Sequence, residues 1–246
     1  MSTLMFYEEP VPLEKKKHVD LKLDRTQNYA FAKTVNSVPL SGMEFFQASR
    51  DFPILFIKNA EGKYLPMAIL SLREASHDMG DNWEGVYVPA FIRRYPFVLT
   101  ADKVVMIDNK APHLNTETGD QLFAAENEPS DTLKQIVNFL ELVDKSFRQT
   151  EEFAAALAEK ELLEPYNATV KYDNNTVKLN DLYAVNEKKL HESLEKDETH
   201  EWFKKGWIAW SYAHLHSLGS MHELVLRQRK SLEAAGAESN EETSEA

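Results

Sequence analysis

Two adjacent arginines stand among aromatic residues in the segment Phe91 to Phe97. Arg93 and Arg94 could form a fork that binds a carboxylate, a phosphate or a peptide terminus, because guanidinium groups match the geometry of these anions. A structural alternative stays open, in which one arginine pairs with a nearby carboxylate and the other stacks on Tyr95 or covers apolar surface. We take Arg93, Arg94 and Tyr95 as the candidate ligand-binding residues.

A second pattern, His18-Val19-Asp20, has the H-x-D spacing found in the facial triads of non-haem iron oxygenases, which a distant histidine completes. The chain has eight histidines and 40 acidic residues, so such a match is expected by chance. The structural alternative is a partly exposed strand that ends in the basic segment Lys15 to His18. We therefore assign no metal ligand, and a small metal-dependent enzyme remains the alternative hypothesis.

Three histidines near the C-terminus, His214, His216 and His222, do not have the spacing of a chelating set. On a helix, residues two apart point about 200° away from each other. His214 and His222 share a face but lie about 12 Å apart along the axis, which is too far for one metal ion. We expect them to be structural histidines.

Three tryptophans, Trp202, Trp207 and Trp210, could form a platform for an aromatic ligand or a carbohydrate. Their spacing with the apolar residues from Tyr212 to Leu218 is helical, and apolar stripes at helical spacing usually belong to a core. We expect these side chains to form a core.

Several kinds of chemistry lack their usual residues. The absence of cysteine excludes disulfides, cysteine-ligated metal centres and thiol nucleophiles. The eight glycines form no GxGxxG, P-loop or GxSxG motif. We assign no catalytic residue and no cofactor, and we expect a non-enzymatic protein.

The net charge of −12 is divided unevenly along the chain, since five glutamates lie beyond Lys230, the last basic residue. Such a charge disfavours general binding to nucleic acid or anionic lipid. The start, Met1 to Lys17, lacks the basic and apolar regions of a secretory signal, and the longest apolar runs are too short to span a bilayer. These features predict a cytoplasmic chain that is not membrane-spanning, unless it reaches the surface by signal-independent export.

The hydrophobic periodicity predicts an α+β fold with two unlike halves. In the first half we expect antiparallel strands with short helices. Two short helices are expected, one starting at the capping box Ser41 to Glu44 and one at Pro89. The expected strands cover residues 29–35, 53–58, 64–72, 97–99 and 104–107. The turn at Asn59 to Lys63, with Gly62 for a positive φ, predicts a hairpin.

The second half is expected to be mostly helical with one β-hairpin. Apolar residues recur at helical spacing from Ser130 to Phe147, which predicts one helix. Thr150, which two glutamates follow, has the pattern of an N-cap, and we expect a second helix from Thr150 to Leu163. Alternating runs at 166–172 and 176–183 predict the hairpin, and further helices follow with breaks at Gly206 and Gly219. We expect one α+β domain over residues 1–230 and a disordered acidic tail over 231–246.

Short segments spread over roughly residues 4 to 222 carry a resemblance to a known family. They are Met5 to Tyr7 with Val11 to Leu13, His18 to Leu23, Val35 to Leu40, Phe52 to Ile54, Tyr87 to Phe97, Leu162 to Pro165 and Tyr212 to Leu218. Together and in this order they are similar to the SapC-like proteins of bacteria. The tail after about residue 230 lies outside the resemblance.

The resemblance implies a role but no chemistry. The family takes its name from a protein tied to the surface layer of a bacterial pathogen, and its genes neighbour those of TonB-dependent receptors and of oxygenase- or halogenase-like enzymes. This implies an accessory or structural protein of a surface layer or an envelope uptake system, with a protein or peptide partner. No catalytic residue can be carried over, and a small anion- or peptide-binding module centred on Arg93 and Arg94 is a further alternative.

Overall fold

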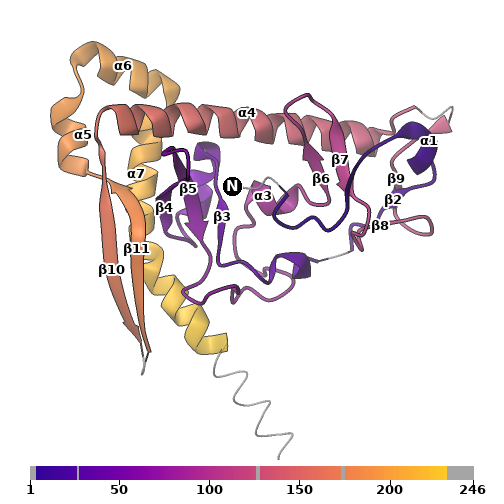
Figure 1. Cartoon of the computed structure of the whole chain (residues 1–246), viewed down its shortest axis with the longest axis horizontal. Helices are drawn as coiled ribbons and strands as arrows, with labels where there is room; N and C mark the ends of the chain where they lie inside the picture. Colours follow the sequence, from indigo (N-terminus) through magenta and orange to yellow (C-terminus); the bar gives the residue numbers. More distant parts are fainter. Residues whose placement is uncertain (1–3, 27, 126–127, 173–174, 232–246) are drawn as a thin grey trace, which may run out of the picture.

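A computed structural model describes residues 4–26, 28–125, 128–172 and 175–231 of the chain (Figure 1). Short antiparallel strands and short helices make up the first half, and the part after residue 130 is helical apart from one long β-hairpin. The structure confirms the predicted α+β class and this division. The expected tail from residue 232 onward and the turn residues Asp173 and Asn174 lie outside the described residues.

The larger sheet has five antiparallel strands in the order β10-β11-β4-β5-β3. The predicted hairpin is confirmed as β4 (Ile54–Lys58) and β5 (Tyr64–Ile69). Its turn uses Gly62 at a φ of +82°, and Asn59 Oδ1 accepts two backbone amides within the turn. The other strands are β3 (Ser37–Pro39) and the second predicted hairpin, β10 (Leu163–Tyr172) and β11 (Asn175–Val185).

Two smaller antiparallel sheets are built mainly from the first 121 residues. One has the order β1-β7-β6 and the other the order β8-β2-β9. Their strands are β1 (Pro10–Pro12), β7 (Val105–Asp108) and β6 (Phe97–Leu99), and β8 (Leu114–Asn115), β2 (Lys22–Leu23) and β9 (Asp120–Gln121). The one-turn helix α1 (Lys15–His18) lies between β1 and β2 in the chain.

The capping box predicted at Ser41 is present and opens η2 (Gly42–Glu44), which continues as α2 (Phe45–Ala48). Helix α3 (Ala90–Arg93) begins after Pro89, which serves as its N-cap residue rather than its first helical residue. The predicted strand over 29–35 is wrong. Residues Ala30–Ala32 form a 3₁₀ turn, η1, because Asn28 Oδ1 accepts the Ala30 amide and starts a turn there.

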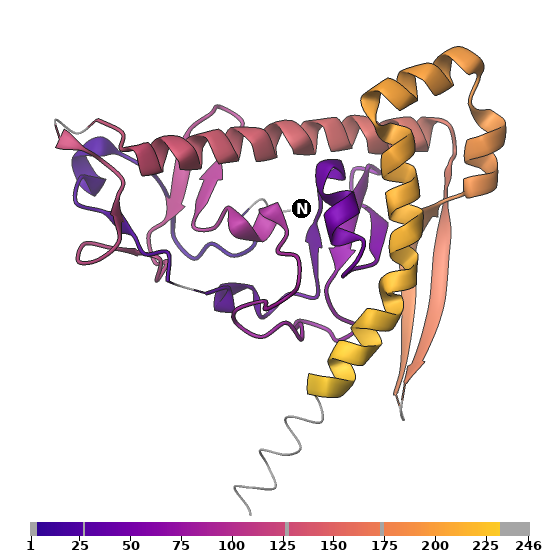
Figure 2. The ribbon, with the colours of Figure 1, turned by 180° about the vertical axis from the view of Figure 1, so that it is seen from behind.

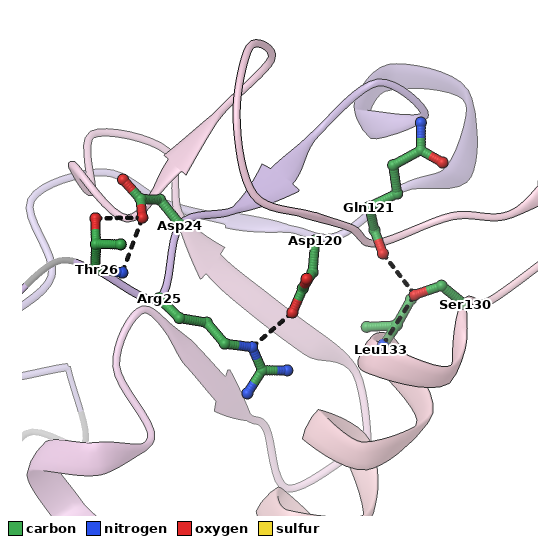
Figure 3. Close-up of polar contacts among 7 residues, drawn as sticks. All are labelled: Asp24, Arg25, Thr26, Asp120, Gln121, Ser130 and Leu133. Carbon is green, nitrogen blue, oxygen red and sulfur yellow. Dashed lines mark hydrogen bonds and ion pairs between the residues drawn. The ribbon is translucent and has the colours of Figure 1, made fainter.

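Helix α4 (Asp131–Glu159) is one continuous helix of 29 residues, so the predicted break and new N-cap at Thr150 are wrong. The hydroxyl of Thr150 instead donates to the Ser146 carbonyl within the helix (2.7 Å). No glycine or proline interrupts this stretch, and the apolar stripe continues through Phe153 and Leu157. The helix begins as predicted at Ser130, whose hydroxyl accepts the Leu133 amide and donates to the Gln121 carbonyl of β9 (Figure 3).

The C-terminal helices cover one end of the larger sheet. Gly206, at a φ of +77°, ends α6 and starts α7 as predicted. The predicted break at Gly219 is also present, because the 3₁₀ turn Leu218–Ser220 separates α7 from helical residues 221–231. Figure 2 shows α7 running beside α2, against which it packs. The bounds are α5 (Glu187–Ser193), α6 (Lys196–Lys205), α7 (Trp207–Ser217) and η4 (Leu218–Ser220).

Two hydrophobic clusters form the core, and α4 contributes to both. Leu133 and Leu140 near its start join Phe97 and Ile107 beneath the smaller sheets. Phe153 and Leu157 near its end join the larger cluster around the five-stranded sheet. As Figure 1 shows, α4 extends across both groups of strands, so it holds the two groups at a fixed separation.

Candidate functional site

A groove of about 760 Å³ lies along α4, between this helix, the β4–β5 hairpin and the end of α3. This volume is within the roughly 300–1,000 Å³ of small-molecule sites. One face of α4 lines it from Leu140 to Ala158, a length of about 27 Å at 1.5 Å per residue. Leu140, Val143 and Phe147 form an apolar wall in the half nearer the start of α4, and the lining also includes the charged residues Asp144, Arg148, Glu151 and Glu152.

Arg94 is the candidate residue that the fold places in this groove. Only 8% of its surface is exposed, and its guanidinium lies 4.0 Å from the centroid of the Phe91 ring. Phe91 in turn meets Phe147 of α4 edge-to-face, with centroids 6.4 Å apart. Burial lowers the pKa of Arg94, while the nearby Tyr7 hydroxyl acts in the opposite direction. The groove therefore combines an apolar wall with a partly desolvated cation.

Arg93 lies elsewhere, so the two guanidinium groups do not share one set of contacts. Its Nε donates to the Val88 carbonyl (2.9 Å), and a terminal nitrogen donates to the Tyr87 hydroxyl (3.4 Å). The guanidinium also lies 5.4 Å from the ring centroid of Phe139. Arg93 is exposed and is not among the residues that line the groove in the described part of the chain. One arginine of the predicted fork thus lines the groove and the other covers aromatic surface.

Tyr95, the third candidate, is 9% exposed and belongs to a buried aromatic and polar cluster. Its ring stacks on Phe31, with centroids 4.0 Å apart, and its hydroxyl donates to Asp108 Oδ2 (2.9 Å). Asp108 Oδ2 and Oδ1 also accept the amides of Glu8 and Glu9 (3.0 and 2.9 Å). Burial raises the pKa of Asp108, but these hydrogen bonds outweigh it and hold the pKa below its usual value.

Replacing Asp108 with asparagine is expected to lower the free energy of unfolding by about 2 kcal/mol at pH 7. Each carboxylate oxygen accepts two donors, and the amide nitrogen of asparagine leaves one of these pairs without an acceptor. Urea unfolding measures the loss. Asp102→Asn, at an exposed turn position, removes the same charge and should change stability by less than about 0.5 kcal/mol. Equal effects of the two changes would contradict this account.

Glu44 holds α3, and so Arg94, in place. This buried carboxylate accepts the Ala90 amide at the start of α3 (2.6 Å) and the Tyr87 hydroxyl (2.9 Å) through Oε1, and the Ser41 hydroxyl (2.8 Å) through Oε2. Burial, with the Glu44 carboxylate nearby, raises the pKa of Tyr87, which keeps its hydroxyl protonated as a donor. The capping box marked Glu44 in the sequence, but its contact with α3 was missed because it joins segments 46 residues apart.

The rim of the groove carries charges of both signs that pair with one another. Asp144 Oδ2 accepts from Lys103 (2.5 Å) and Arg148 (2.7 Å). Partial burial raises the pKa of Asp144, but the two cations outweigh it and lower the pKa. On the β4–β5 turn, Lys63 pairs with Glu61 at 3.0 Å. An ionised, paired carboxylate suits the binding of polar groups better than proton transfer at neutral pH.

The other chemical candidates have structural partners. His18 Nδ1 accepts the Glu14 amide (2.9 Å), and in the ranges that the structure describes no three histidine, aspartate or glutamate residues are placed to hold one metal ion. Trp202, Trp207 and Trp210 are 4–7% exposed and pack around Phe153, as the core interpretation predicts. None of the helices in the described part of the chain has the length and apolar character of a membrane span.

Comparison with known proteins identifies a family but no closer relative. A profile described as SapC matches residues 13–224, which include α3, α4 and the whole groove. The resemblance found in the short segments of the sequence is therefore confirmed. No curated protein and no solved structure matches the chain.

Proposed function

The chain belongs to the SapC family, and we propose that it acts by binding, as an accessory or structural component of a bacterial surface layer or of an envelope uptake or transport system. The groove along α4 carries this proposal, and we assign it as the contact site for a protein or peptide partner. Its apolar wall, its buried Arg94 and its paired rim charges are the features of a binding surface.

The shape of the groove supports an elongated partner. Its lining extends along about 27 Å of α4, from Leu140 to Ala158, and it is bounded on the other side by the β4–β5 turn. The wall formed by α4 is preformed, because α4 is a single helix anchored in two core clusters. A preformed surface loses little entropy on binding. In this proposal the chain meets its partner from the cytoplasmic side or after signal-independent export.

Filling the groove should abolish partner capture without unfolding the protein. Ala155 is exposed and lines the groove, so Ala155→Trp places a large ring in it at no cost to the core. Ala209→Trp is the matched control, because Ala209 is exposed on α7 and outside the described lining. Each immobilised protein is incubated with a detergent extract of a bacterial envelope, and retained proteins are identified by mass spectrometry.

We expect the wild type and Ala209→Trp to retain the same surface-layer or transport component and Ala155→Trp to lose it at least tenfold. Circular dichroism and the unfolding midpoint confirm that both variants are folded. Retention that is unchanged in Ala155→Trp would show that the groove is not the contact site. Turnover of a substrate by the wild type without any retained partner would overturn the binding function itself.

A further inference from the structure

We infer that the groove binds an extended, cationic amphipathic segment of a partner protein, with apolar side chains against the first half of the α4 wall and two lysines or arginines facing Glu151 and Glu152. This inference rests on the proposed function and names the chemistry of the segment that the groove would recognise. Two features of the lining support it. Large apolar side chains and uncompensated carboxylates occupy different parts of α4, and the groove is long and narrow.

The large apolar side chains that α4 contributes lie in the half nearer its start. Leu140, Val143 and Phe147 follow one another at helical spacing, and Phe147 meets Phe91 edge-to-face with centroids 6.4 Å apart. Phe147 is only half-buried, so part of its ring remains accessible to a partner. Apolar side chains of a partner that pack here leave water, which favours association.

The charges of the other half are unbalanced in favour of carboxylates. Glu151 and Glu152 line the groove, are exposed, and form no ion pair with any residue in the described part of the chain. Lys63 of the β4–β5 turn pairs with Glu61 (3.0 Å), and its pKa is raised mainly by this partner and to a smaller extent by the charge of Glu151. One ammonium group therefore faces three carboxylates, and a partner with two cationic side chains would balance the charge.

The remaining charged residues of the lining already have partners. Asp144 accepts from both Lys103 and Arg148. Arg94 has interactions of its own, including its contact with the Phe91 ring. We assign no group of the partner to these residues. The carboxylates at Glu151 and Glu152 lie about 10 Å along α4 from the apolar side chains, at 1.5 Å per residue.

The dimensions of the groove favour an extended segment over a helix. A volume of about 760 Å³ along about 27 Å gives a mean cross-section of about 28 Å². A helix with its side chains is at least about 10 Å across and needs roughly 80 Å², whereas an extended chain is much thinner. Because an extended chain rises about 3.3 Å per residue, its first cation should follow its central apolar residue by about three positions.

The test compares two synthetic peptides that differ in charge alone. Fluorescein-labelled Gly-Ser-Leu-Val-Leu-Ser-Lys-Lys amide has its first lysine three positions after the valine, and the second peptide has glutamine in place of both lysines. Binding to the full chain is followed by fluorescence anisotropy. We expect the lysine peptide to bind about 3- to 30-fold more tightly in low-salt buffer, and this preference to fall below about twofold in about 0.5 M NaCl.

Replacing both carboxylates of the groove, as Glu151→Gln with Glu152→Gln, should remove the preference and leave binding of the glutamine peptide unchanged. The matched control is Glu141→Gln with Glu159→Gln, because both residues are exposed on α4 and neither lines the groove within the described ranges. This control removes the same charge and should keep the preference. All four side chains are exposed, so both double variants should unfold at the same urea concentration as the wild type.

Equal binding of the two peptides in low-salt buffer, no binding of either, or a preference that survives the loss of both groove glutamates overturns the inference. A third peptide, with serine in place of the valine and both leucines, keeps the lysines and tests the apolar wall. It should bind at least tenfold more weakly than the lysine peptide. Equally tight binding would mean that the groove only attracts cations, and would reject an amphipathic segment.

These outcomes are separable from those of the proposed function. Loss of the envelope partner in Ala155→Trp, together with equal binding of the lysine and glutamine peptides, would keep the binding function and reject the cationic segment. A preference for lysine that depends on Glu151 and Glu152, without any retained envelope component, would keep the recognition chemistry and reject the envelope role.

Discussion

A single methyl group at position 42 is expected to lower the free energy of unfolding by about 3 kcal/mol or more. The Cβ of Gly42→Ala would lie 2.6 Å from ring atoms Cδ2 and Cζ3 of Trp210 and closer still to Cε3. Trp210 cannot move aside, because its ring packs edge-to-face on Phe153 and beside Phe45, with centroids 5.5 and 6.4 Å away. The Gly42 amide is also bound to Thr150 Oγ1 (2.8 Å). Relieving the clash would separate η2 from both α4 and α7.

Urea unfolding followed by circular dichroism measures this loss. Gly219→Ala is the matched control, because a Cβ at Gly219 has no heavy atom within 4 Å, and it should change stability by less than about 0.5 kcal/mol. In the double variant with Trp210→Leu, the cost should be smaller than the sum of the two single costs, since the leucine makes room for the methyl group. A Gly42→Ala protein within about 1 kcal/mol of wild type would show that this contact is not rigid.

Local signals in the sequence predicted several of the short elements. The capping box at Ser41, the Asn59 and Gly62 turn, the Ser130 N-cap and the Gly206 break each act within a few residues, and each is present in the structure. Such signals depend on backbone donors and conformations that the residue itself supplies. These elements could therefore be predicted from the sequence without knowledge of the rest of the fold.

Both incorrectly predicted elements contain residues with contacts far along the chain. Thr150 followed by two glutamates has the pattern of an N-cap, but its hydroxyl accepts the amide of Gly42, 108 residues away, and the helix continues. The alternating residues around Tyr29 and Phe31 suggested a strand, yet these rings pack with Trp83 and Tyr95 in an aromatic cluster. The same alternation of apolar residues is produced by a strand face and by two rings in a turn.

The candidate site was predictable only in part. The sequence marked Arg93, Arg94 and Tyr95 as a unit, whereas the fold directs them to three surroundings: aromatic surface, groove and buried cluster. The groove itself could not be predicted, because its walls come from α4 and from a hairpin about 80 residues earlier. Only the tertiary arrangement shows which of the two arginines lies in it.

Two of the segments that carry the family resemblance form one joint between α7 and the larger sheet. Ser217 Oγ accepts the Ile54 amide at the start of β4 (2.9 Å), and His214 Nε2 accepts the Val185 amide at the end of β11 (3.0 Å). His214 is fully buried and lies edge-to-face with Phe56, with centroids 5.2 Å apart. The histidines near the C-terminus were expected to be structural, and His214 has this role.

Protonation of His214 should make the fold strongly sensitive to acid. Burial lowers its pKa to about 4 from an ordinary value of 6.5, with an interaction at the Ile54 backbone opposing the shift only in part. The unfolded chain therefore binds a proton more readily than the folded chain, so stability is full above pH 6.5 and falls as the pH decreases toward 4. Between pH 7.5 and pH 4.5 the protonation of this one group is expected to remove about 2 to 3 kcal/mol of stability. His77 and His113, whose pKa values burial also lowers, act in the same direction.

His214→Gln isolates this contribution, because a glutamine oxygen can accept the Val185 amide but does not titrate. The variant should be somewhat less stable at pH 7.5. Its loss of stability on going to pH 4.5, measured by urea unfolding at each pH, should be about 2 to 3 kcal/mol smaller than that of the wild type. His216→Gln, at an exposed position two residues later, should reproduce the wild-type loss. If both variants lose as much stability as the wild type, His214 is not neutral in the folded protein, and the α7 joint must accommodate its charge.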